Sequence, residues 1–134
     1  MNLKNPYPLL FSTGALGYGG IEILWRGNTH WSMLLTGGAC LVLLYIVDGK
    51  LPELSYLKKC LFGAFTITGM EFVVGCGVNL GLKLDVWDYS KEAFNFMGQV
   101  CLLYVFLWFL LCLPLFKLCG GFRRYFAQKS AGTV

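Results

Sequence analysis

One acidic residue, Glu71, lies inside an apolar stretch that is long enough to cross a membrane. Glu71, Gly75, Asn79 and Lys83 recur every four residues, and this spacing places them on one face of a helix. A charged side chain at the centre of a membrane helix costs about 2.5–3.5 kcal/mol on insertion scales, so it usually faces other helices or a water-filled cavity. No basic residue lies three or four positions from Glu71, so we expect it to be protonated or hydrogen-bonded to another helix. Two roles stay open: a structural hydrogen-bond acceptor, or a site for a substrate, a proton or an ion.

A similar polar face comes earlier in the chain. Gly14, Tyr18, Glu22 and Arg26 are also spaced by four residues. Glu22 lies near the end of its helix, and the acid-first order predicts an ion pair with Arg26. That pair would be a satisfied interfacial contact or part of a binding site. We expect the two polar faces to meet, or to line one cavity that opens to the outside of the cell.

Aromatic and polar residues gather where these two helices end. Four of them, Trp25, Trp31, Trp87 and Tyr89, are typical of an aromatic belt at the membrane surface. Asp88 can form an Asx turn, and Asn95 and Gln99, four residues apart, are expected on one face of the fourth helix. One His and two Asp without local spacing are a poor metal site, so we predict no metal and no cofactor. No activated nucleophile stands out either, so we assign no catalytic residue, and an enzyme is the less favoured class. The predicted cavity residues are Glu22, Arg26, His30, Glu71, Asn79, Trp87, Asp88, Tyr89, Asn95 and Gln99.

The elements that must position these residues are membrane helices. Hydrophobic residues make up 57% of the 134 residues and charged residues 13%, about half the charged fraction of a soluble domain. Continuous apolar runs favour helices over a barrel. We therefore predict an all-α polytopic membrane protein with four transmembrane helices in two hairpins, and no nucleic-acid partner. The predicted spans are residues 7–25, 31–47, 57–82 and 94–119, a transmembrane domain over residues 1–119 that leaves 120–134 as a basic cytoplasmic tail.

Basic residues predict the orientation in the membrane. Eight would lie on one side and three on the other, which predicts a cell-membrane protein with both termini in the cytoplasm. The eight are Lys4, Lys50, Lys58, Lys59, Lys117, Arg123, Arg124 and Lys129, and the three are Arg26, Lys83 and Lys91.

A Gly-x-Glu pattern in both outward-going helices, ending at Glu22 and at Glu71, is compatible with a parallel internal repeat. The many glycines predict close helix packing, and the six cysteines are interpreted as small packing residues.

Several stretches resemble a known family. GYGGIEILWRG, HWSMLLTGGAC, EFVVGCGVNLGLKLDVWDYS and FNFMGQVCLLYVFLW are similar to the CmpB-like, type IV group of ABC transporter permeases, small bacterial membrane proteins, over about residues 10–115. The positions that match its pattern are Glu22, Arg26, Gly27, Glu71, Gly75, Asn79, Trp87, Asp88, Tyr89, Ser90, Asn95, Gly98 and Gln99. The resemblance implies a transport component, although the chain carries no phosphate-binding G-x-x-x-x-G-K-[ST] motif of an ATPase.

Three functions remain open at this stage. The first is a transporter or permease component with an outward-facing polar cavity lined by intramembrane Glu residues, which would need a homo-oligomer or other membrane subunits. The second is a non-catalytic membrane scaffold that binds a partner. The third is a membrane enzyme acting on a lipid or cell-wall intermediate, with Glu71 or Asp88 as the acid or base. Besides the lipid bilayer, a small-molecule or lipid ligand is expected for the first function.

Overall fold

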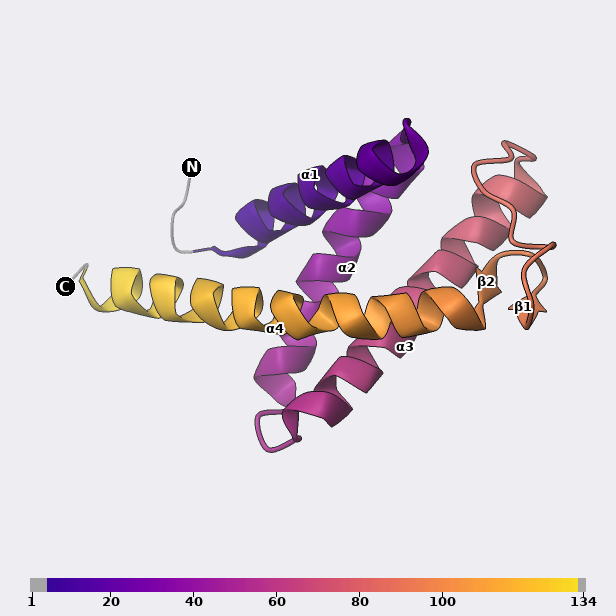
Figure 1. The fold of residues 1–134 in the computed structure, drawn as a ribbon. Helices are drawn as coiled ribbons and strands as arrows, with labels where there is room; N and C mark the ends of the chain where they lie inside the picture. Colours follow the sequence, from indigo (N-terminus) through magenta and orange to yellow (C-terminus); the bar gives the residue numbers. More distant parts are fainter. Residues whose placement is uncertain (1–4, 133–134) are drawn as a thin grey trace.

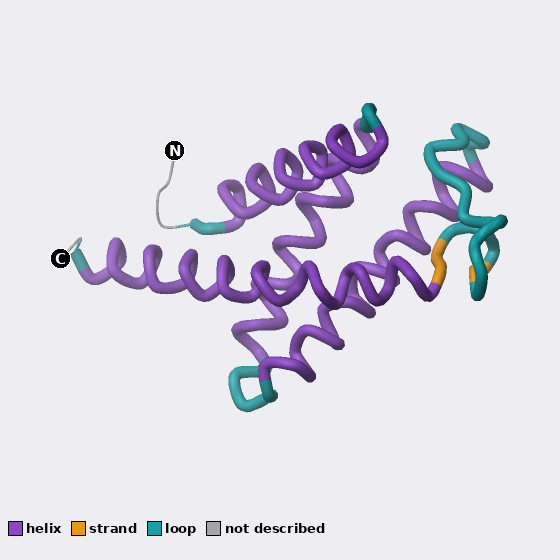
Figure 2. The backbone as a smooth tube through the Cα atoms, in the orientation of Figure 1, coloured by secondary structure: helices purple, strands orange, loops and turns teal. Residues whose placement is uncertain are grey.

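The computed structural model describes residues 5–132, so Lys4 lies outside the described residues. Its architecture is helical, as predicted, with one small hairpin of two antiparallel strands (Figures 1 and 2). In chain order the elements are α1 (Tyr7–Arg26), α2 (Trp31–Lys50), α3 (Tyr56–Gly75), the π-helix η1 (Cys76–Gly81), β1 (Asn95–Phe96), β2 (Val100–Cys101) and α4 (Leu102–Ala131). Helices α2 and α3 form a V joined by a short turn, α1 packs along α2, and α4 crosses and contacts both arms of the V.

Three helical segments of the described chain are long and apolar enough to cross a membrane by length and composition. They are Trp31–Lys50, Tyr56–Gly81 and Leu102–Ala131. The protein is therefore a membrane protein with at least three candidate spans. Helix α1 is not among them, so a fourth span and an internal repeat stay predictions.

Close approach of glycines holds α1 against α2. A Cβ atom added to Gly14 would lie 2.5 Å from the carbonyl oxygen of Gly37, so neither helix could come this close with a larger residue at that position. Helix α1 ends at Arg26 and is capped by Gly27, whose φ of +80° is in the left-handed region that favours glycine. The expected close packing through small residues is confirmed at this contact.

The core lies where α2, α3 and α4 meet, and cysteines are part of it. Cys60, Cys112 and Cys119 are fully buried and free, beside Leu44 and Ala64. These three cysteines fill narrow spaces between helices, which confirms their interpretation as small packing residues.

An ionic cluster joins the same three helices at the end opposite Arg26. Asp48 of α2 pairs with Lys59 of α3 at 3.0 Å and with Arg123 of α4 at 3.4 Å.

Helix α4 continues past residue 119 to Ala131, and its 30 residues span about 45 Å, more than the roughly 30 Å of a hydrocarbon core. The described part of the predicted tail is thus a helical extension of α4 (Figure 1).

The end of α3 differs from an ordinary helix. From Cys76 to Gly81 the chain forms a π-helix, and the N–H of Leu82 donates to the carbonyl of Gly77, five residues back, at 2.9 Å. Lys83 comes after this turn with a φ of +56°. The expectation that Lys83 continues the Glu71 face is therefore wrong, because the helix widens and ends before reaching it.

The connection from η1 to α4 is long and holds the β hairpin. We call residues 82–101 the connecting segment. Asn95 lies in β1 and Gln99 in the turn before β2, whereas α4 begins only at Leu102. The expected common helix face for Asn95 and Gln99 is wrong. Phe94, directly before β1, and Met97, in the turn between the strands, have positive φ values, which a continuous helix cannot contain.

Candidate functional site

The two polar helix faces meet at one hydrogen bond. The hydroxyl group of Tyr18 on α1 donates to Oε1 of Glu71 on α3 at 3.1 Å. Glu71 is only 1% exposed, and its second carboxylate oxygen has no hydrogen-bond partner within residues 5–132. The indole N–H of Trp108 on α4 is also buried without a partner in that part of the chain, and the ring of Trp108 lies 5.9 Å from that of Tyr18. Of the two expected states of Glu71, protonated or hydrogen-bonded to another helix, the structure shows the hydrogen bond, which Glu71 accepts.

The predicted ion pair at the end of α1 is also present. Nη1 of Arg26 lies 3.1 Å from Oε2 of Glu22, and Nη2 of Arg26 donates to the carbonyl oxygen of Val86 at 2.5 Å. Arg26 therefore connects α1 to the connecting segment. Because the guanidinium has five N–H donors in a planar fork, it can satisfy the carboxylate and the carbonyl at the same time.

A buried amide pair holds the connecting segment against η1. Nδ2 of Asn79 donates to Oε1 of Gln99 at 2.8 Å, while Oδ1 of Asn79 accepts from the N–H of Val86 at 2.7 Å. The indole of Trp87 donates to the carbonyl of Gln99 at 2.9 Å. Trp87 is buried, so it is not an exposed residue of an aromatic belt. A Cβ atom added to Gly75 would lie 2.6 Å from Oε1 of Gln99, which leaves room only for glycine.

Further hydrogen bonds shape the hairpin. Asp88 accepts from the backbone N–H of Ser90 at 2.9 Å, the predicted Asx turn. This bond holds the pKa of the Asp88 carboxyl below its usual range, so the group is ionised at neutral pH. Asn95 donates to the carbonyl of Glu92 at 2.9 Å and accepts from the N–H of Gly98 at 3.1 Å. Both side chains are part of the scaffold of the turn.

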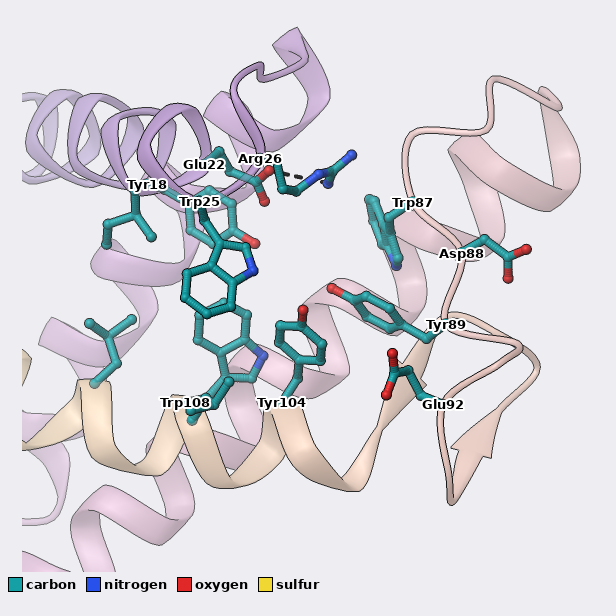
Figure 3. A pocket seen from close by; sticks show the side chains of 13 residues that line it. Tyr18, Glu22, Trp25, Arg26, Trp87, Asp88, Tyr89, Glu92, Tyr104 and Trp108 are labelled. Atoms are coloured by element: carbon teal, nitrogen blue, oxygen red, sulfur yellow. Dashed lines mark ion pairs between the residues drawn. The ribbon is translucent and has the colours of Figure 1, made fainter.

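A cavity of about 500 Å³ lies between α1, the connecting segment and α4 (Figure 3). Among the described residues, three carboxylates and one guanidinium line it, those of Glu22, Asp88, Glu92 and Arg26. Its aromatic lining residues are Tyr18, Trp25, Trp87, Tyr89, Tyr104 and Trp108. We call this space the aromatic cavity.

Three of these rings form a continuous wall. Tyr89 stacks on Tyr104 with ring centroids 4.6 Å apart, and Tyr104 is followed at 6.2 Å by Trp108. Figure 3 shows the hydroxyl groups of Tyr89 and Tyr104 on the same side as Glu22. The carboxylate of Asp88 is directed away from that side, toward its own turn.

The structure places the predicted site residues in four different surroundings. Five of them line the aromatic cavity, namely Glu22, Arg26, Trp87, Asp88 and Tyr89. Glu71, Asn79 and Gln99 are buried behind it, and Asn95 lies in the hairpin. His30 caps α2 by accepting the N–H of Ser32 at 3.2 Å, and it lines a second cavity of about 280 Å³ that shares the Glu22–Arg26 pair.

Among the lining residues that the predicted cavity set did not include are Glu92, Tyr104 and Trp108. Tyr104 and Trp108 are four residues apart in α4, so the spacing that identified Glu22 with Arg26 could have identified them as well. Glu92 carries no such signal, because its position depends on the path of the connecting segment.

Comparison with known proteins adds one match. A family model described as "Putative ABC-transporter type IV" matches residues 27–132. The match includes Trp87, Tyr104 and Trp108 and begins directly after Arg26. No curated protein and no solved structure matches the chain.

Proposed function

The chain belongs to the ABC-transporter type IV family, and from this premise we propose that it is a membrane-embedded transport component whose aromatic cavity binds the transported molecule. The observation that carries the proposal is the cavity itself. It is large enough for a small organic ligand, and it combines apolar rings with a few charged groups, as ligand sites do.

The Glu22–Arg26 pair supports a binding role for this space. Its side chains are 11% and 34% exposed, so the pair lies at the edge of the cavity, partly shielded from solvent. Ionised groups in such a place are stabilised by each other and by any polar ligand that reaches them. Arg26 also lines the smaller cavity near His30, so it lies between the two spaces. A ligand in the aromatic cavity could therefore alter the contact of Arg26 with the Val86 carbonyl.

We place the aromatic cavity on the outer side of the cell membrane. The basis is the distribution of basic residues: Lys50, Lys59 and Arg123 belong to the opposite end of the bundle, and an excess of Lys and Arg marks cytoplasmic ends. A path across the membrane would require a second copy or other subunits, because so few helices enclose little space by themselves.

A scaffold function is the second candidate, and one observation favours it. Much of the family-like pattern is engaged in internal hydrogen bonds: Asn79 with Gln99, Trp87 with the carbonyl of Gln99, and Asn95 with its own turn. These residues give the connecting segment a defined shape, which could serve a protein partner as well as a cavity.

A cavity-filling variant separates the two candidates. Leu107 lines the aromatic cavity, whereas Leu110, on the same helix, is 43% exposed and does not. We expect Leu107→Trp to lose small molecules that co-purify with the wild-type protein in native mass spectrometry, and Leu110→Trp to retain them. If both variants retain the same small molecules, the cavity is not the binding site and the transport proposal fails. Loss of a protein partner through Asn79→Leu, with Leu107→Trp unaffected, would support the scaffold.

A further inference from the structure

A third space, distinct from the cavity near His30, lies beside the aromatic cavity along the helices. It measures about 150 Å³ and lies between α1, α2 and α4. Tyr18, Ile21, Trp108 and Leu111 line both spaces, so the two lie next to each other. We call this third space the apolar groove.

The two spaces differ in polarity. The described residues that line the apolar groove include no charged side chain, and most of them are aliphatic, glycine or Trp108. All the charged lining residues belong to the aromatic cavity. A ligand that fills both spaces must therefore have a polar head and an apolar chain.

The charges of the aromatic cavity indicate the sign of that head. Arg26 is the only cation among its described lining residues, and Glu22 and the Val86 carbonyl already engage it. The Asp88 carboxylate is directed away, toward its own turn, where it accepts from the N–H of Ser90. Glu92 is therefore the carboxylate that remains, and no ion pair joins it to a basic residue within residues 5–132. The lining thus has an excess of negative charge and favours a cationic head group.

The aromatic wall points to the same chemistry. A cation within about 6 Å of a ring face is attracted by the ring quadrupole, and clustered rings recognise substituted ammonium groups in this way. Tyr89, Tyr104 and Trp108 are arranged around one side of the cavity, with Glu92 next to Tyr89 in Figure 3. A substituted ammonium group, which has few N–H donors, fits a site made mainly of rings.

We propose that the ligand is a single-chain amphipathic cation with a substituted ammonium head. This proposal rests on the proposed function. The head lies against Tyr89, Tyr104 and Trp108, and the chain follows Ile21 and Leu111 into the apolar groove. A free cation fits better than a phospholipid, because the phosphate of a phospholipid would lie near the carboxylate of Glu92, which has no basic partner among the described residues.

The test compares three probes that differ in one property at a time. Full-length protein is placed in phosphatidylcholine nanodiscs, and empty nanodiscs give the background from lipid partition. We expect saturable binding of decyltrimethylammonium, with decyl sulfate and tetramethylammonium each at least about 10-fold weaker, equivalent to about 1.4 kcal/mol. The sulfate has the same chain with the opposite charge, and tetramethylammonium has the same head without a chain.

Two pairs of variants locate the binding. Trp108→Leu should weaken binding of decyltrimethylammonium about 10-fold, whereas Trp108→Phe, which keeps a ring, should lose less than about 3-fold. Glu92→Gln, on the exposed turn, should weaken it about 3-fold at low salt, and Glu53→Gln, exposed at the opposite end, should leave it unchanged.

Binding of decyl sulfate as tight as that of the cation would overturn the inference, and so would equal losses in Trp108→Leu and Trp108→Phe. Saturable binding of either amphiphile that Leu107→Trp abolishes would still support the aromatic cavity as the binding site. If neither amphiphile binds saturably, the inference is overturned, and the co-purification result for Leu107→Trp decides the proposed function separately.

Discussion

The hydroxyl group of Tyr18 on α1 and the carboxyl group of Glu71 on α3 are joined by a hydrogen bond of 3.1 Å. Tyr18 also lines both the aromatic cavity and the apolar groove, whereas Glu71 lies behind it and is nearly inaccessible. The intramembrane acid is thus one hydrogen bond away from the proposed ligand site. A change at Tyr18 can therefore affect both the packing of α1 on α3 and the shape of the cavity.

Substitutions of Glu71 should separate a structural role from an ionisable one. Glu71→Gln keeps an acceptor for Tyr18 and should unfold close to wild type, because shape and hydrogen bonding are preserved. Glu71→Ala leaves the Tyr18 hydroxyl without its acceptor and should lose about 1–2 kcal/mol of stability. Thermal unfolding in nanodiscs measures both, and a double-mutant cycle with Tyr18→Phe isolates the pair. Equal destabilisation by Gln and Ala would contradict the structural role.

The contact of Arg26 with Glu22 and Val86 should anchor the connecting segment. Arg26→Ala removes both contacts and is expected to cost about 1 kcal/mol, a modest value because the guanidinium is one-third exposed. Hydrogen exchange should increase at residues 84–90 more than in α2. Arg26→Lys keeps the charge without the fork, so it should recover the pairing with Glu22 better than the bond to Val86. Unchanged exchange in Arg26→Ala would show that Arg26 does not hold the segment.

A pair of glycines on α3 provides a matched test of the packing of the connecting segment. A Cβ atom at Gly75 would lie 2.6 Å from Gln99 Oε1 and 2.8 Å from Trp87 Cζ2, whereas one at Gly69 meets nothing within 4 Å. Gly75→Ala should therefore destabilise the protein by about 1–3 kcal/mol. Gly69→Ala should be neutral or slightly stabilising, because alanine favours the helix. Equal unfolding temperatures for the two variants would mean that the segment does not pack on α3 as described.

The buried hydrogen bond between the amides of Asn79 and Gln99 should stabilise the connecting segment against η1. Asn79→Leu keeps a similar size but leaves Gln99 and the N–H of Val86 without their partner. We expect a loss of about 2 kcal/mol and faster hydrogen exchange across residues 84–101. The exposed Asn28 is the control position, and Asn28→Leu should change exchange only locally. Exchange that rises equally throughout the protein would indicate general destabilisation instead.

The stability of the Asx turn at Asp88 should decrease as the pH falls. Its pKa is lowered by the hydrogen bond from Ser90, so the stabilisation is fully present above the unfolded value of about 3.9. It is lost as the pH falls through the lower folded value. The Ser90 amide should stay protected at pH 5–7 and lose protection below about pH 4, and Asp88→Asn should remove this dependence. Loss of protection between pH 5 and 7 in the wild type would contradict it.

Local patterns in the sequence were sufficient for the helices. Apolar runs predicted the helical class and most element ends of α1, α2 and α3, because burial in lipid requires continuous helices. The four-residue spacing predicted the Glu22–Arg26 pair, and it placed Tyr18 and Glu71 on faces that do meet. These features depend only on the spacing of residues along a helix, which can be read from a short stretch of sequence.

The tertiary structure decided most of the chain between Cys76 and the start of α4. The π-helix, the hairpin with Asn95 and Gln99, and the late start of α4 at Leu102 are stabilised by hydrogen bonds between residues up to twenty positions apart. Sequence periodicity carries no information on such pairs. Assembly of the cavity also required α4 to cross the other helices, which brings Trp108 near Tyr18. Packing between distant segments, and not local propensity, determines which polar residues line a cavity and which are buried as scaffold.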